Sequence, residues 1–275
     1  MLKKNPKERI RMLELNNIYC GDARLVMKDI DDESVDMVIT SPPYDNLRTY
    51  NNPDNPWNFD VFKGVADELY RVIKPGGVVV WIVNDRTMKG SKTLTSFKQA
   101  LYFNEIGFNV NDVMIWNKTN PCPVVAQPRY TDTFDYMMVF SKGKPKTFNP
   151  IMVDCKNAGK LYKSTAKMIG GESGRRKVYY NVSEKKVKGN VWDFAVAQNK
   201  SGHPAVYPYD VVLDHIKTWT NKGDIVLDPF IGSGTTALVC IDMKRNYIGI
   251  DISEEYCKMS RDRIEELTIC SEPSE

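Results

Sequence analysis

The sequence predicts an α/β fold in which a doubly wound, mostly parallel sheet carries helices on both faces. Two observations support this: short apolar, β-branched runs recur along the chain, and helical patterns separate them. Continuous apolar runs are typical of strands that are buried on both faces of a parallel sheet. A third observation is a polar, basic stretch that follows neither pattern and interrupts the sheet as an insertion. The expected strands are residues 17–20, 35–40, 77–83, 224–228 and 246–251.

Helices are expected between these strands, because apolar residues there recur at helical spacing. In residues 59–73 the apolar positions include Phe62, Val65 and Leu69, and Lys74-Pro75-Gly76-Gly77 ends the helix. Residues 112–117 and 134–140 are expected to form an antiparallel pair at the edge of the sheet. The other expected helices are residues 95–106, 208–219, 235–242 and 254–267.

The composition is that of an ordinary globular enzyme. The 275 residues suffice for one large domain, or for a core with an insertion. No apolar stretch approaches the roughly 18 residues that span a bilayer, and residues 1–7 lack the apolar core of a signal peptide. We therefore expect a cytoplasmic protein that does not associate with membranes.

The cysteines predict neither a disulfide framework nor a metal site. They form no C-x-x-C pair, and with only two histidines, His203 and His215, no ligand cluster forms. Cys20 and Cys240 lie in apolar stretches, as buried thiols commonly do. We expect reduced thiols and no bound metal for all six: Cys20, Cys122, Cys155, Cys240, Cys257 and Cys270.

Positive charge is concentrated in one part of the chain. Residues 141–190 contain thirteen lysines and arginines against three acids, a net charge of +10, whereas the whole chain carries +3. The remainder therefore carries −7. Such asymmetry indicates a face for a polyanion, although a solvated lysine-rich loop explains the charge equally well. We divide the chain into residues 1–140, an insertion at 141–200, and residues 201–275.

The first informative motif lies at residues 226–236, where a buried strand enters a glycine turn that begins a helix. Glycines there let the backbone approach a ligand closely. About seventeen residues after Gly234 the next strand ends at Asp251, where an acid commonly binds ribose hydroxyls. Asp228 at the start of the turn disfavours a pyrophosphate, because the two would repel each other. A zwitterionic amino acid that carries a sulfonium fits this turn better.

The second motif is Ser41-Pro42-Pro43-Tyr44, directly after the expected strand 35–40. Ligands of open α/β sheets bind at the carboxyl ends of strands. Two prolines remove two N–H donors and hold the segment extended, which leaves the Ser41 hydroxyl and the Pro42 carbonyl as a rigid edge of acceptors. By itself, Pro-Pro more often does no more than end a strand, but its combination with the glycine turn favours a functional site.

That edge suits an exocyclic base amine, whose lone pair is delocalised into the ring. Two acceptors aligned with the amine hydrogens favour its pyramidal form and offset the positive charge that develops on methyl transfer. Tyr44 can stack on a base rotated out of the duplex.

Together the two motifs resemble the DNA amino-methyltransferases that make N4-methylcytosine or N6-methyladenine. The family carries a [Asp/Asn/Ser]-Pro-Pro-[Tyr/Phe/Trp] motif and a Phe-x-Gly-x-Gly motif, which match residues 41–44 and 230–234 here. Their order, with the basic segment between them, resembles the permuted β class, in which the insertion is the target recognition region. The resemblance covers most of the chain and implies a Rossmann-like methyltransferase sheet and S-adenosylmethionine as cofactor.

The resemblance also assigns roles to individual residues. Gly21-Asp22-Ala23 looks like the segment that holds the cofactor adenine, and His203 lies in a region similar to the one that holds its methionine end. A capping or packing role suits His203 equally well, and contact of Asp85 with a ligand stays open. The expected cofactor-binding residues are Asp22, Ala23, His203, Asp228, Phe230, Gly232, Gly234, Thr235 and Asp251, and the catalytic residues are Ser41, Pro42, Pro43 and Tyr44.

Double-stranded DNA is the expected partner, with Arg175, Arg176, Lys177, Lys185 and Lys186 as the expected contacts. A homodimer and a cognate restriction endonuclease are compatible with the resemblance. Within the family, Ser at position 41 favours cytosine N4, with adenine N6 second. Other readings are a methyltransferase of RNA or of a protein amide, a catalytically inactive DNA-binding paralogue, and a nicotinamide dehydrogenase.

Overall fold

The computed structural model describes residues 13–44, 57–123, 128–167, 175–196 and 207–271. Contacts divide the chain into two units, which we call the core unit (residues 1–149 and 190–275) and the insertion unit (residues 150–189). The insertion unit is thus shorter than the segment 141–200 that the charge pattern suggested.

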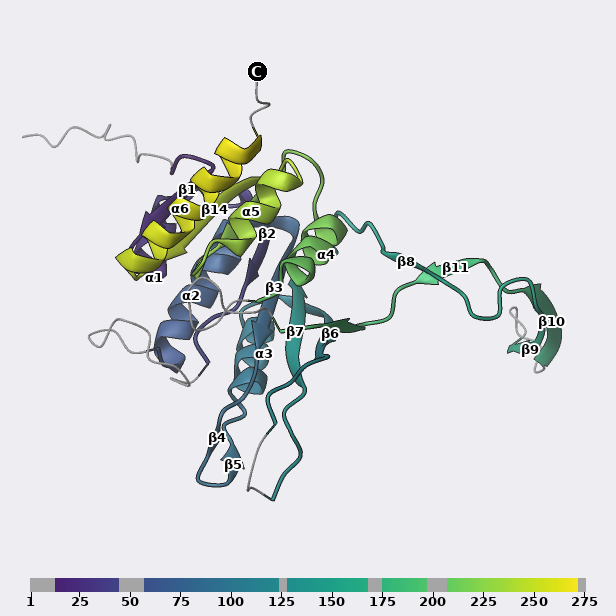
Figure 1. Cartoon of the computed structure of the whole chain (residues 1–275). Helices are drawn as coiled ribbons and strands as arrows, with labels where there is room; N and C mark the ends of the chain where they lie inside the picture. Colours follow the sequence, from purple (N-terminus) through teal and green to yellow (C-terminus); the bar gives the residue numbers. More distant parts are fainter. Residues whose placement is uncertain (1–12, 45–56, 124–127, 168–174, 197–206, 272–275) are drawn as a thin grey trace, which may run out of the picture. The chain divides into compact units, whose positions relative to one another are not determined.

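Within the described residues, eight strands of the core unit form one sheet (Figure 1). Their spatial order is β1-β14-β13-β2-β3-β7-β6-β12. All neighbouring pairs are parallel except the two pairs that involve β7, which runs opposite to the rest. The bounds are β1 Asn17–Cys20, β2 Val35–Thr40, β3 Ile73–Val83, β6 Asn109–Lys118, β7 Phe134–Ser141, β12 Val191–Phe194, β13 Ile225–Asp228 and β14 Asn246–Asp251.

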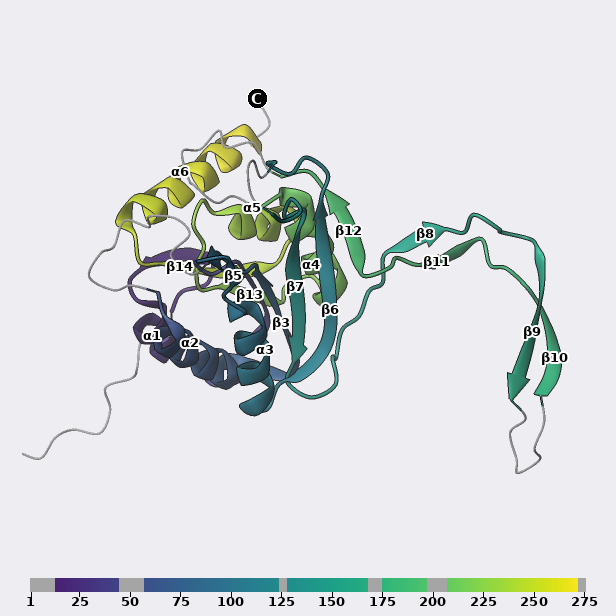
Figure 2. The ribbon, with the colours of Figure 1, turned by 90° about the horizontal axis from the view of Figure 1, so that it is seen from below.

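Helices cover both faces of this sheet, as the doubly wound prediction requires. Seen along the sheet, α1, α2 and α3 lie on one face and α4, α5 and α6 on the other (Figure 2). The bounds are α1 Ala23–Val26, α2 Phe59–Val72, α3 Thr95–Glu105, α4 Tyr209–Trp219, α5 Thr235–Asp242 and α6 Glu254–Ser271. A short 3-10 helix, η1 (Met27–Asp29), follows α1, and strands β4 (Thr87–Met88) and β5 (Ser91–Lys92) form a small hairpin before α3.

The core explains why α2 forms where the pattern predicted it. Phe62, Val65 and Leu69 are buried against the sheet, and each such side chain stabilises the fold by about 1.5–3 kcal/mol. The helix begins at Asn58, whose side chain accepts hydrogen bonds from the amides of Asp60 and Val61 at 2.9 Å each.

Three expectations need correction. The antiparallel pair β6 and β7 is present but does not form the edge, because β12 pairs with β6 outside it. β12 was assigned to the insertion, yet Trp192 is buried and anchors this strand in the core unit. Cys240 is buried as expected, but Cys20 is exposed, because it is the last residue of the edge strand β1.

The insertion unit consists of two antiparallel ladders. Strand β8 (Met152–Asp154) pairs with β11 (Lys185–Val187), and β9 (Leu161–Lys167) pairs with β10 (Arg175–Asn181). None of the side chains described in this unit is buried. Two-stranded ribbons of this kind are only marginally stable alone in water.

Candidate active site

The carboxyl ends of four adjacent parallel strands place several predicted site residues along one edge of the sheet. The strands are β1, β14, β13 and β2 in spatial order, and a polar or glycine-containing segment follows each of them. Neighbouring strands lie about 4.8 Å apart, so one small ligand can reach all four segments. The residues at these ends are, in the same order, Asp22, Asp251, Asp228 and Ser41.

The glycine turn between β13 and α5 is fixed by β14 and α6. The amide of Gly232 donates to Oδ2 of Asp251 at 3.0 Å, and Oγ of Ser260 donates to the Gly232 carbonyl at 2.6 Å. Gly234 has a φ of +84°, and a Cβ there would lie 3.1 Å from Cβ of Ser260. Both the backbone conformation and the close approach of α6 therefore require glycine.

Asp251 presents a carboxylate beside this turn. Its Oδ1 accepts from the amide of Ser253 at 2.9 Å, and the residue is 8% exposed. Burial raises the pKa of this carboxyl to about 6. Each carboxylate oxygen accepts more than one hydrogen bond, so Asp251 keeps acceptor capacity for hydroxyl groups of a ligand.

Asp22 provides a second carboxylate at the end of β1. It caps α1 by accepting from the amide of Arg24 at 2.9 Å, and it forms an ion pair of 2.5 Å with Nη2 of the same arginine. Its side chain is 15% exposed. The neighbouring Ala23 is buried in the core, so only the backbone of Ala23 is available to a ligand.

Phe230 gives the turn an apolar wall. Its ring packs edge-on against Trp57 with ring centroids 5.1 Å apart, and against Trp81 at 6.3 Å. Thr235 is the first residue of α5 and is only 4% exposed. An aromatic wall, two carboxylates and a glycine turn fit a nucleoside that carries an amino-acid group.

Asp228 does not face this edge. It is fully buried, and its oxygens accept from Thr40, Tyr207 and Thr236 at 2.6 Å each and from the Phe230 amide at 3.1 Å. Burial raises its pKa, and the four donors oppose that rise. Asp228 is therefore not placed to repel a pyrophosphate, contrary to the expectation from the sequence, because its carboxylate points into the protein.

The segment Ser41-Pro42-Pro43-Tyr44 follows β2 directly. Ser41, Pro43 and Tyr44 are half-buried and Pro42 is buried. The Ser41 hydroxyl donates to the Tyr44 hydroxyl at 3.0 Å, which brings the two ends of the segment together, and the Tyr44 ring packs against the core. The polar edge and the aromatic ring predicted from the sequence therefore lie side by side.

Residues 35–262 match the profile of the DNA methylases, the N6/N4 methyltransferase family. The chain belongs to this family. A curated relative, the orphan methyltransferase M.BamHII of Bacillus amyloliquefaciens, is 44% identical over 253 residues, which cover 88% of this chain and 93% of that protein. The DNA adenine methyltransferase YhdJ of Escherichia coli (strain K12) is 30% identical over 263 residues, which cover 92% of this chain and 83% of that one.

Solved structures agree with the fold of this DNA methylase. The crystal structure of the M1.HpyAVI–SAM complex matches with a TM-score of 0.60 and 27% identity, covering 90% of this chain and 98% of that one. The cytosine-N4-specific PvuII DNA methyltransferase matches with a TM-score of 0.66 and 20% identity, covering 96% and 94%. The second likeness concerns the fold alone.

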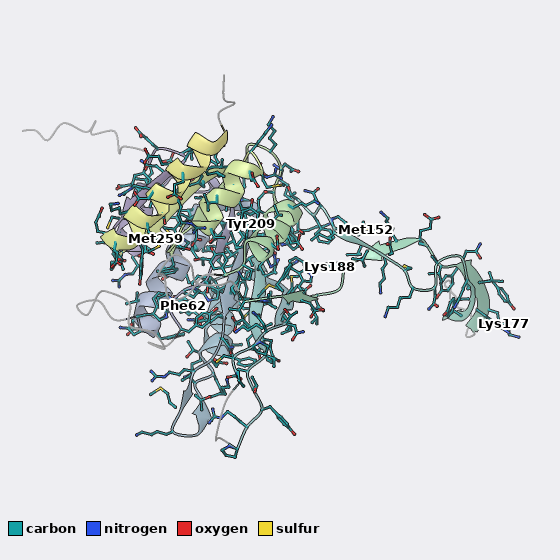
Figure 3. The ribbon with its side chains drawn as sticks, in the orientation of Figure 1. Phe62, Met152, Lys177, Lys188, Tyr209 and Met259 are labelled. Atoms are coloured by element: carbon teal, nitrogen blue, oxygen red, sulfur yellow. The ribbon has the colours of Figure 1, made fainter. Side chains whose placement is uncertain are left out.

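The predicted DNA contacts of the methylase all lie in its insertion unit. Lys177 on β10 (Figure 3) and Lys185 and Lys186 on β11 are exposed. The backbones of Arg175 and Arg176 pair with Lys167 and Ala166 of β9.

Two other residues singled out from the sequence are His203 and Asp85. His203 lies outside the described residues. Asp85, whose role was open, accepts from the amide and the hydroxyl of Ser96 at 2.9 and 2.7 Å, so its carboxylate holds the first turn of α3. Sequence reasoning missed Thr40 and Tyr207, the partners of Asp228. Thr40 adjoins the catalytic motif, which is a usable signal, but nothing in the sequence singles out Tyr207.

Within the described residues of the methylase, no group of three histidine, cysteine, aspartate or glutamate side chains is placed to hold a metal ion. In the same part of the chain no helix is long and apolar enough to cross a membrane.

Proposed function

We propose that this DNA methyltransferase transfers a methyl group from S-adenosylmethionine to the exocyclic amine of a flipped base, at cytosine N4, within a specific DNA sequence. One observation carries the proposal: the acceptor edge Ser41-Pro42 ends strand β2, and the glycine turn ends the neighbouring strand β13. This arrangement would bind the methyl acceptor and the methyl donor at adjoining strand ends.

The cofactor is held by residues of four segments. Asp22 would hold the adenine, Asp251 would accept from the ribose hydroxyls, and Phe230 would cover the apolar part of the nucleoside. The turn at Gly232 and Gly234, with Thr235 behind it, lets the backbone approach the amino-acid end. His203 is proposed to contact the same end. When bound, S-adenosylmethionine supplies an electrophilic methyl group on a sulfonium.

The chain prepares the amine to accept that methyl group. The Ser41 hydroxyl, which has acceptor lone pairs, and the Pro42 carbonyl bind the two amine hydrogens, which frees the nitrogen lone pair from the ring. Pro43 contributes no N–H and holds the preceding residue extended. Tyr44 stacks on the flipped base. The amine loses its proton to water after transfer, so no strong general base is needed.

The insertion unit is proposed to bind the DNA. Its β9–β10 ribbon has two different faces, because strand residues alternate. One face carries Lys163, Lys177 and Tyr179, with the Lys163 ammonium 5.9 Å from the centre of the Tyr179 ring. The other carries Tyr162 and Tyr180, whose rings stack at 6.4 Å.

A ribbon of this size fits the major groove, and cations on one face can reach phosphates. We place the phosphate contacts on the face that carries Lys163 and Lys177. Arg175 and Arg176, in the same strand as Lys177, are proposed as further contacts. Lys185 and Lys186, on the second ladder, are proposed as further contacts.

Cytosine N4 is proposed because Ser41 opens the catalytic motif. Adenine N6 is the second candidate, and it is supported by the 30% identity to a DNA adenine methyltransferase. Both amines present two hydrogens to the same acceptor edge.

Base-resolved detection of methylated positions in DNA from cells that express the protein tests the proposal, with the Ser41→Ala variant as control. N4-methylcytosine at one short sequence, absent in the control, is the expected result. If N6-methyladenine is found instead, the target base is adenine, and the proposed reaction at an exocyclic amine stands. No mark on DNA despite cofactor binding would contradict the proposal and leave RNA, or an inactive DNA-binding role, as the alternative.

Every group in this mechanism comes from one chain, so neither a second copy nor a restriction endonuclease is needed for the chemistry. A homodimer remains a prediction. Sedimentation tests it by comparing the mass in solution with the monomer mass of 31.4 kDa. The cognate restriction endonuclease remains a prediction too; digestion of modified and unmodified DNA with candidate endonucleases tests it. A cytoplasmic location is proposed because the substrate is DNA.

A further inference from the structure

A buried polar cluster joins the catalytic motif to the cofactor turn. Its members are Thr40, Tyr207, Asp228 and Thr236, and the Asp228 carboxylate is at its centre. Tyr207 and Thr236 also contact each other, with their oxygens 2.5 Å apart. Thr40, Asp228 and Thr236 have no exposed surface. Burying a carboxylate destabilises a fold unless the carboxylate is hydrogen-bonded. A fold that retains a buried carboxylate therefore either uses the hydrogen bonds that it accepts or is less stable because of it.

One oxygen of the carboxylate bridges the two motifs. Oδ1 of Asp228 accepts from Oγ1 of Thr40 at 2.6 Å and from the amide of Phe230 at 3.1 Å. Thr40 is bonded covalently to Ser41, the first residue of the acceptor edge, and Phe230 belongs to the cofactor turn. The other oxygen, Oδ2, accepts from Tyr207 and Thr236 and takes no part in the bridge.

The bridge lies just beyond the end of the backbone ladder between β13 and β2. That ladder has two registered pairs, Val226 with Met37 and Leu227 with Val38. The next residues along each strand lead to the two motifs, and the Thr40–Asp228 bond joins the strands there. A side-chain hydrogen bond thus replaces the ladder at the point where the reacting groups must be spaced.

We propose that Thr40 is a positioning residue for methyl transfer, which acts through Asp228 to set the spacing between the acceptor edge and the cofactor turn. This inference rests on the proposed function of both motifs. Thr40 itself touches neither substrate nor cofactor. Because displacing reacting groups by about 1 Å can cost about 100-fold in rate, a spacing bond of this kind acts on kcat more than on the binding of either substrate.

The test compares four variants of the full chain. Thr40→Val removes the hydroxyl at nearly constant volume, and Thr40→Ser keeps it. Tyr207→Phe deprives the same carboxylate of a donor without breaking the bridge. Thr218→Val makes the same chemical change at another buried threonine, whose hydroxyl donates to the Asp214 carbonyl within α4 at 2.7 Å.

The measurements are single-turnover methyl transfer at saturating cofactor and DNA, cofactor Kd by titration, and Tm. Thr40→Val is expected to lower the rate by about 10- to 100-fold while Kd changes by less than about 3-fold. Thr40→Ser is expected to retain most of the rate of the unsubstituted enzyme. Tyr207→Phe is expected to lower the rate less than Thr40→Val does, and Thr218→Val to leave the rate unchanged.

Several results would overturn the proposal. They are a Thr40→Val rate within about 2-fold of the unsubstituted enzyme, a Thr40→Ser rate as low as that of Thr40→Val, or a loss in Tyr207→Phe as large as in Thr40→Val. If Thr40→Val does not fold, Thr40→Ala, which also removes the hydroxyl, is measured in its place, and the same outcomes apply. Failure of the unsubstituted enzyme to methylate DNA would instead reject the proposed function.

Discussion

The core unit and the insertion unit of this methyltransferase differ in what determines their structure. In the core unit, large side chains such as Phe62 and Trp81 are fully buried, and the strand ends they support carry the proposed chemistry. In the insertion unit, no described side chain is buried and most of the charged residues are cationic. Packing therefore specifies the first, whereas strand pairing alone specifies the second, which displays its cations to solvent. Substitutions in the two units should affect different steps.

The largest effect is expected at the acceptor edge of the core unit. Ser41→Ala removes one of two acceptors that oppose the charge developing on the amine, so kcat should fall by about 100- to 1000-fold. DNA affinity should stay unchanged, because the insertion unit is intact. Rapid-quench methyl transfer and fluorescence anisotropy with labelled duplex measure the two quantities. A rate close to that of the unsubstituted enzyme would remove Ser41 from the mechanism.

A second, smaller effect is expected at the aromatic ring of the same segment. Tyr44→Ala removes the stacking surface for the flipped base, so the rate should fall by about 10- to 100-fold, in line with about 1–3 kcal/mol per stacked base. Cofactor Kd should change much less, whereas Tyr44→Phe should retain most of the rate. A normal rate in Tyr44→Ala would count against stacking.

The insertion unit should respond in the opposite way. Lys163→Gln combined with Lys177→Gln removes two cations from one face of the β9–β10 ribbon. DNA affinity should fall on the order of 10-fold at low salt, and the slope of log K against log salt should decrease by about 2, since each phosphate contact contributes about 0.9. The rate at saturating DNA should stay unchanged.

A matched control for this pair exists in the core unit. Lys28 and Lys222 are exposed and lie in connections that lead to the amino ends of β2 and β13, opposite the site. Replacing both with Gln removes the same charge. An equal loss of affinity in this control would mean that overall charge, and not the ribbon, binds DNA.

The smallest expected effect is a pH dependence confined to the core unit. Asp251 has a pKa of about 6, raised by burial, so it takes up a proton as the pH falls from 7.5 to 5.5. A protonated carboxyl accepts more weakly from ribose hydroxyls, so cofactor Kd should rise by a few-fold over this range. Asp251→Asn should flatten the profile, whereas the ribbon variants should leave it intact. A flat profile in the unsubstituted enzyme would contradict this role of Asp251.

The same carboxyl has a defined effect on stability. Because its pKa is higher in the folded than in the unfolded chain, its contribution to folding is most favourable below about pH 4 and is lost as the pH rises through about 6.

The sequence predicted most of the core unit because burial leaves a readable pattern. The apolar runs at residues 35–40 and 246–251 are buried on both faces, and they became β2 and β14. β12 was missed because it is four residues long and buries one side chain, Trp192. The ladders of the insertion unit were missed for a related reason: neither has a buried face, so no alternation of polar and apolar residues marks its strands.

The site residues that lie directly after predicted strands could be placed from the sequence. Ser41 comes directly after an apolar run, so its place at the carboxyl edge follows from the chain order alone. The direction of the Asp228 side chain does not, because it depends on Thr40 and Tyr207, which lie 188 and 21 residues away. Partners at such distances leave no local pattern in the sequence.

The order of strands in the sheet also has a consequence for synthesis. β1 lies beside β14, so the carboxylates of Asp22 and Asp251 that are proposed to hold the nucleoside come from opposite ends of the chain. A polypeptide still emerging from the ribosome contains the acceptor edge and the basic ribbon long before it contains β13, β14 and α6. By the proposed assignment, such a nascent chain lacks the glycine turn and Asp251 and would not yet modify DNA. The proposed cofactor site is therefore complete only once β14, the last strand of the chain, lies between β1 and β13.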